Sequence, residues 1–208
     1  MLKEAPLFII EGRCFFIPSF HIFDFPKQNE HMAFLDSQSI ENRLAGKIVS
    51  GVKLYNVAEH YYAIDTNKIA VDGAIAISFE EETLVIGWSK KQELIDCIFG
   101  KPADVLEDMP FYEVEDVQHV FDFAGETIQS MNIKWNFFEE FDDNFEIIEG
   151  KNYIIEELIL SMSNDRSLQI AAVNCEIAHG AINYIEFNAQ GNILVVVDEV
   201  MEIASVEL

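Results

Sequence analysis

The chain is poor in positive charge and in long apolar runs. Its 208 residues include 13 Lys and Arg against 37 Asp and Glu, which gives a formal net charge of −24. A protein this acidic repels phosphate backbones and anionic lipids, so we expect neither direct nucleic-acid binding nor docking on a membrane. No apolar run approaches the roughly 20 residues that cross a bilayer, and the run 7–10 is too short for a signal peptide. These observations predict a cytoplasmic protein.

Cysteine is too sparse to form a disulfide framework. Cys14, Cys97 and Cys175 lie far apart in the sequence, and their number is odd. Proteins stabilised by disulfides usually carry a denser and even set. We therefore expect reduced and mostly buried thiols.

Motifs that would fix a reaction or a cofactor are also lacking. The sequence contains no dinucleotide-binding glycine pattern, no P-loop and no nucleophile elbow. Cys175 and His179 are four residues apart, but a zinc site needs two more ligands. Glu156 and Glu157 are adjacent, so a strand would point them to opposite faces. We predict no cofactor, no metal and no catalytic residues, and we keep an enzyme with dispersed acidic residues as an alternative.

The apolar residues are sufficient for a large core and favour strands. Half of the chain is apolar, and short runs rich in β-branched and aromatic residues are separated by Gly, Pro and acidic turns. The pattern predicts an α+β protein, predominantly antiparallel β-sheet with two to four helices. Strands are expected at 7–10, 14–17, 20–25, 61–64, 68–71, 74–79, 83–88, 112–123, 127–135, 167–173, 181–187, 192–197 and 200–208, whereas 153–160 fits a strand or a helix.

Two segments carry helical patterns, and one carries a hairpin pattern. Residues 36–51 repeat an apolar residue every four positions, and residues 89–99 combine a capping box with an apolar stripe before Gly100. The segment 101–110 then reads as a connector. Asn188–Gly191 places a glycine between two predicted strands, which predicts a hairpin turn.

The two halves of the chain differ in charge. Residues 1–104 carry 15 acids and 10 bases, a net of −5, whereas residues 105–208 carry 22 acids and 3 bases, a net of −19. We place a candidate domain boundary between 104 and 105. A weak echo between 69–86 and 177–196 favours two similar sub-domains, and one continuous domain is the alternative.

The stretch 134–151, KWNFFEEFDDNFEIIEGK, is the densest acidic segment. On a helix capped by Asn136, its phenylalanines would share one face and its acids the other. Like charges at these spacings repel each other by roughly 0.2–0.5 kcal/mol per pair. Binding of a Lys- and Arg-rich partner would relieve this repulsion. The alternative is that the acidic face serves only to keep the protein soluble. The predicted partner-binding residues are Glu139, Glu140, Asp142, Asp143, Glu146 and Glu149.

The acidic composition and the lack of catalytic motifs favour two functional classes. The first is a binding protein that neutralises a basic protein, in its most concrete form a bacterial immunity protein against a nuclease-type toxin, because enzymes that cut nucleic acids are usually basic. The alternative is a structural or assembly module of a phage or secretion apparatus, whose acidity serves only solubility. The sequence does not predict an oligomeric state.

Overall fold

The computed structural model divides the chain into two compact units, Leu35–Val206 and Met1–Phe34 with Glu207–Leu208. In the second of these, the described part is one antiparallel hairpin of β1 (Phe8–Ile10) and β2 (Arg13–Phe15). The structure describes residues 8–10, 13–15, 37–57, 62–65, 67–89, 94–107, 109–115, 120–138, 152–178 and 181–204.

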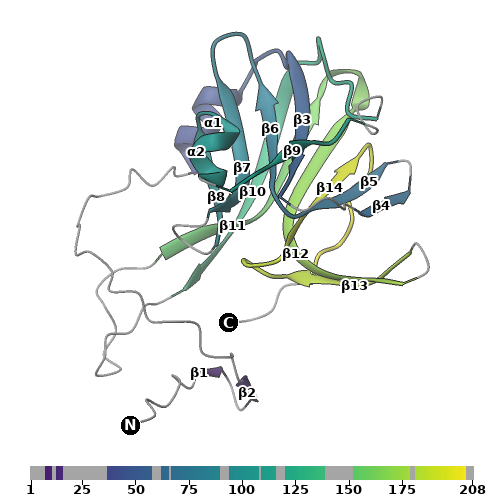
Figure 1. Ribbon diagram of the computed structural model, residues 1–208. Coiled ribbons are helices and arrows are strands. Elements are labelled where there is room, and N and C mark those ends of the chain that lie inside the picture. The colour runs from purple at the N-terminus through teal and green to yellow at the C-terminus, as the bar shows by residue number, and fades with distance from the viewer. Residues whose placement is uncertain are drawn as a thin grey trace. The chain divides into compact units, whose positions relative to one another are not determined.

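Two antiparallel sheets form the unit Leu35–Val206 (Figure 1). The five-stranded sheet has the order β8-β7-β6-β3-β9. It is built on the hairpin of β6 and β7, in which Ser78 pairs with Thr83 across the acidic turn 80–82, as the sequence predicted. Its strands are β3 (Gly51–Asn56), β6 (Ala74–Ser78), β7 (Thr83–Ser89), β8 (Leu94–Phe99) and β9 (Tyr112–Glu113).

The seven-stranded sheet has the order β10-β11-β12-β14-β5-β4, and β13 also pairs with β12. The segment 153–160, which fitted two elements equally, lies in a strand of this sheet. The strands are β4 (Tyr62–Asp65), β5 (Lys68–Val71), β10 (Ile128–Phe138), β11 (Asn152–Met162), β12 (Ser167–Ala178), β13 (Ala181–Phe187) and β14 (Asn192–Val197).

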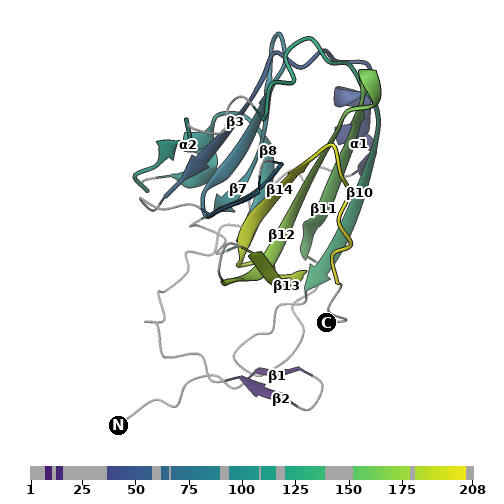
Figure 2. The same ribbon diagram turned by 90° about the vertical axis from the view of Figure 1, so that its right-hand side faces the viewer.

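The core lies between the two sheets, which face each other in Figure 2. The strand expected at 74–79 is confirmed as β6, and its large and small residues alternate: Ile75 and Ile77 pack in this core while Ala74 and Ala76 pack on the other face. There the small alanines leave room for the helix α2 (Pro102–Leu106). Each fully buried aliphatic side chain contributes about 1.5–3 kcal/mol, so this burial favours the two-layer arrangement.

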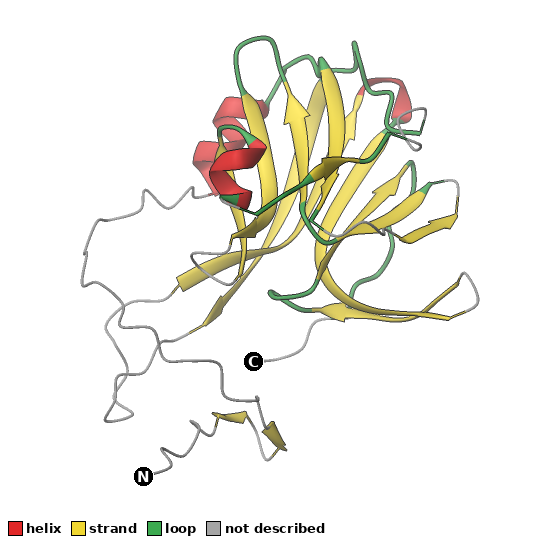
Figure 3. Cartoon of the chain, in the orientation of Figure 1, coloured by secondary structure: helices red, strands yellow, loops and turns green. Residues whose placement is uncertain are grey.

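Helix is a minor part of the described chain (Figure 3). It comprises α1 (Ser37–Leu44), α2 and a short 3-10 turn, η1 (Ser163–Asp165). The prediction of a helix at 36–51 is right at Leu44, which is fully buried, but wrong beyond it: Ile48 is 59% exposed and forms a β-bridge with Thr127. Among the described residues, no helix has the length and apolar character that crossing a bilayer requires.

The helix predicted at 89–99 is wrong. Residues Leu94–Phe99 form β8, which pairs along its whole length with β7. Ile95 and Cys97 pair with Trp88 and Ile86, so they face the core by a strand's alternation. The apolar residues of this short run fit a period of two as well as a helical stripe, and the neighbouring strand decides between them.

The hairpin predicted at Asn188–Gly191 is also wrong, although both flanking strands are confirmed. β13 pairs with Val173–Ala178 and β14 pairs with Leu168–Val173, so the two strands follow one another along the same side of β12. The four residues between them form a loop that bulges from one long interrupted strand. Gly191 lies so close to β12 that a Cβ atom there would stand 2.1 Å from the Val173 carbonyl oxygen.

Three further predictions need correction. Among the described residues of the strand expected at 112–123, only β9 is a strand, because 114–115 and 120–123, which include the buried Phe121, lie outside any strand. The connector 101–110 contains α2, which the sequence analysis missed. The expected final strand at 200–208 is not a strand up to residue 204, where Ala204 forms one isolated bridge with Glu186.

Strand pairing crosses the 104/105 position. β5 and β4, from the first half, join the acidic strands of the seven-stranded sheet, and β9 joins the sheet of the first half. The proposed sub-domains at 1–104 and 105–208 stay a prediction, as does their similarity.

Candidate acidic interface

The partner-binding residues predicted from sequence, Glu139 to Glu149, lie outside the described residues. The structure does describe the start of the helix expected there, and this part is wrong. Asn136 and Phe137 belong to β10, where they pair with Ile154 and Tyr153 of β11. A helix capped by Asn136 is therefore excluded, whereas the role of the six carboxylates stays a prediction.

The scarcity of positive charge in the second half shapes the described surface. Of its three bases, Lys134 and Arg166 are described, and both form ion pairs with carboxylates of the same half. Neither cation is therefore available to neutralise an approaching anion without losing an internal contact.

Lys134 is paired with a buried carboxylate on the outer face of the seven-stranded sheet. Its Nζ contacts an Oε atom of Glu156, whose side chain is 3% exposed, and the Asn136 amide donates to the same carboxylate at 3.3 Å. Burial of a carboxylate is costly unless it is paired and hydrogen-bonded, so Lys134 compensates Glu156.

A β-bulge brings Glu156 and Glu157 to the same face of the sheet, against the prediction that they point apart. The register of β10 and β11 shifts between Lys134 and Trp135, which leaves Glu156 as the extra residue. Glu157 pairs with Lys134 across the strands, so its side chain lies on the face where Lys134 contacts Glu156. An extra residue in one strand breaks the period of two, which is why spacing alone gave the wrong result.

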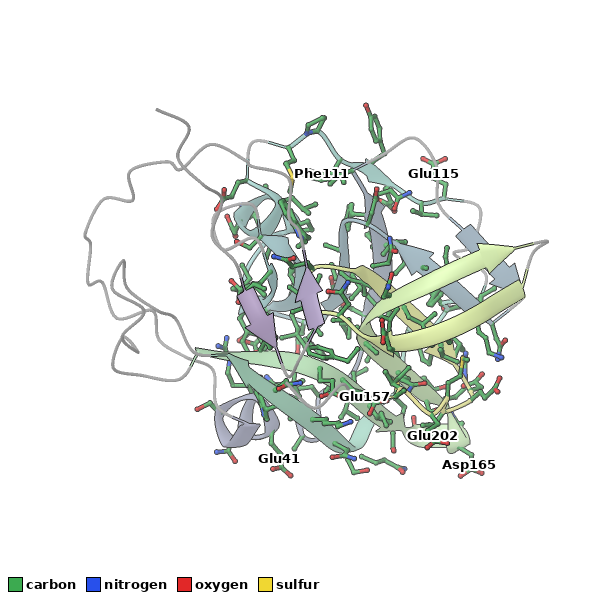
Figure 4. All side chains as sticks on the ribbon, turned by 90° about the horizontal axis from the view of Figure 1, so that it is seen from below. Glu41, Phe111, Glu115, Glu157, Asp165 and Glu202 are labelled. Atoms are coloured by element: carbon green, nitrogen blue, oxygen red, sulfur yellow. The ribbon has the colours of Figure 1, made fainter. Side chains whose placement is uncertain are left out.

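The Gln169 side chain forms hydrogen bonds with both Glu157 and Met201. The fully buried Gln169 amide donates to Glu157 and, at 2.8 Å, to the Met201 carbonyl, while its Oε1 accepts from the Met201 N–H at 2.8 Å. The next residue, Glu202, is exposed. We call the segment 198–204 the C-terminal strap, and Figure 4 labels Glu157 and Glu202.

Sequence analysis missed Gln169, although a signal was present. It is the one polar residue in the otherwise apolar run 168–173. A polar side chain inside a buried strand requires hydrogen-bond partners, so its position predicts a buried contact with some other segment.

Arg166 is held at one end of the seven-stranded sheet. Its Nε donates to both carboxylate oxygens of Asp198, at 3.0 and 2.9 Å, and an Nη donates to the Asp122 carbonyl at 2.9 Å. The guanidinium also lies 4.3 Å from the centre of the Phe123 ring, a cation–π contact. These contacts fix the cation to the fold.

A neighbouring carboxylate, Glu126, is stabilised in its charged form. The Ser163 hydroxyl donates to it, and the Asn164 amide donates at 3.1 Å. These hydrogen bonds hold the pKa of Glu126 below its ordinary value.

The three exposed carboxylates of the second half that Figure 4 labels do not all lie on one side of the molecule. Figure 4 shows Asp165 and Glu202 toward one side of the molecule and Glu115 toward the opposite side. Glu41, from the first half, projects from a third position. These four labelled residues therefore do not form one acidic surface by themselves.

The described side chains include neither a cluster of metal ligands nor a reactive thiol. No group of three or more His, Cys, Asp or Glu among them is placed to hold a metal ion. Cys97 is partly buried and packs against the core, and this burial raises its pKa far above the usual range, with a smaller contribution from Asp96. The thiol is therefore protonated at neutral pH and is a poor nucleophile.

Trp88 and Trp135 are both partly buried and pack against the core. Neither tryptophan is therefore an open platform for a flat ligand. Comparison of the chain with protein families, with curated proteins and with solved structures found no match, so the residues described above are the basis for any functional proposal.

Proposed function

We propose that this chain is an acidic binding protein that neutralises a basic protein partner, in its most concrete form an immunity protein against a nuclease-type bacterial toxin. The observation that supports the proposal is the charge of the second half, −19 over residues 105–208. Its two described cations are already paired within the fold, so they do not offset the field that a partner would meet.

Such a field has a specific kinetic effect. Complementary charge raises the association rate of two proteins by a factor of roughly 10 to 1,000, and salt removes this gain. A nuclease active site is lined by cations that grip phosphates, so a carboxylate-rich surface can cover it in place of the substrate. We assign the contact to Glu139, Glu140, Asp142, Asp143, Glu146 and Glu149.

The test uses the protein encoded by the adjacent reading frame as the probe. The expected result is a basic nuclease that this chain binds and inhibits. The quadruple variant Glu139→Gln, Glu140→Gln, Asp142→Asn and Asp143→Asn should lower the association rate constant at least roughly tenfold at low salt. Stopped-flow mixing at 50 and 500 mM salt measures the rate.

A matched control removes carboxylates elsewhere. Glu41, Glu80 and Glu81 are exposed residues of the first half, and their replacement by Gln removes three negative charges, against four in the quadruple variant. If this control slows association as much as the quadruple variant, the contact is not at 139–149. If the adjacent protein is neither basic nor bound, the immunity function is wrong.

Light scattering after size-exclusion chromatography tests the assembly module. A stable homo-oligomer of high order, formed without a partner, would favour that alternative. A monomer that forms a stoichiometric complex with a basic protein would contradict it.

A further inference from the structure

We draw no further inference here: the strongest candidate, the outer edge of β10 at Ser130–Ile133, where the half-exposed Met131 and Ile133 flank the core, carries no proposal because nothing in the described part of the structure shows what covers it.

Discussion

The Gln169 side chain and the Met201 main chain exchange two hydrogen bonds, each 2.8 Å long, between the seven-stranded sheet and the C-terminal strap. Met201 offers one donor and one acceptor, and the primary amide of Gln169 satisfies both. The strap also contributes Ile203, which is 8% exposed, and its last described residue accepts a hydrogen bond from the Phe187 N–H at 2.9 Å. The strap is therefore attached to the fold by Met201, Ile203 and Ala204.

Replacing Gln169 by Leu should weaken this attachment. The variant keeps the apolar volume but leaves both Met201 main-chain groups without these partners, at a cost of about 1–3 kcal/mol in the free energy of unfolding. Urea titration measures the loss, and hydrogen exchange should show faster opening at the Met201 amide. Gln190→Leu, at an exposed glutamine, should change stability by less than about 0.5 kcal/mol. Unchanged Met201 exchange in Gln169→Leu would show that the side chain does not hold the strap.

Replacing Lys134 by Met should be more costly than replacing an exposed lysine. It leaves the buried Glu156 carboxylate without its ion-pair partner, so we expect a loss of about 2 kcal/mol or more at neutral pH. Lys53→Met removes a more exposed pair, with Glu113, whose side chains are 52% and 29% exposed. That control should cost no more than about 1 kcal/mol. Equal losses in the two variants, measured by urea titration, would argue against a compensating role for Lys134.

Replacing Asp96 by Asn should stabilise the protein at neutral pH. Burial raises the pKa of Asp96 in the folded state, although a hydrogen bond from the Cys97 N–H at 2.7 Å opposes the shift. The wild type therefore loses stability as the pH rises through the pKa of Asp96 in the folded state. Asn keeps the side-chain oxygen that accepts from the Cys97 N–H but does not ionise, so the variant avoids that loss. Thermal unfolding should give a higher Tm for the variant at pH 7, with the difference vanishing below about pH 4. A constant difference at all pH values would exclude ionisation as the cause.

Replacing Glu126 by Gln should have the opposite pH dependence. Hydrogen bonds from Ser163 and Asn164 lower the pKa of Glu126 in the folded state. The ionised Glu126 therefore stabilises the fold above the pKa that it has in the unfolded chain, about 4.3. This stabilisation is lost as the pH falls through the pKa of the folded state. The variant should unfold more easily than wild type at neutral pH and show a smaller loss on acidification. In a Glu126→Gln, Ser163→Ala double variant the two effects should be less than additive, and full additivity in acid titrations would contradict the coupling.

The local residue pattern predicted much of the antiparallel sheet. Ala74–Ser78 was correctly placed, because alternating large and small residues identify a strand whose two faces are covered differently. Leu94–Phe99 was not, since six mostly apolar residues fit a helix or a strand until β7 pairs with them. The link between 188–191 and its flanking strands depends on β12, which no local turn signal encodes.

The contacts of the charged and polar side chains were harder to predict from the sequence than the strands were. Counting residues identified the excess of acid, but it did not show that Lys134 and Arg166 are used inside the fold. The shared face of Glu156 and Glu157 depends on a bulge, and Met201, the main-chain partner of Gln169, lies 32 residues away in sequence. These relations arise from tertiary pairing, which composition and periodicity do not report.

The position of β14 also affects how the chain folds during its synthesis. Although it is the last of the described strands along the chain, it lies between β12 and β5 in the sheet. A growing polypeptide therefore presents the open edges of β12 and β5 until residues 192–197 have left the ribosome, and these edges can pair with other chains. We expect that a ribosome stalled before residue 192 holds a nascent chain prone to aggregate, and that the sandwich closes only after β14 has emerged.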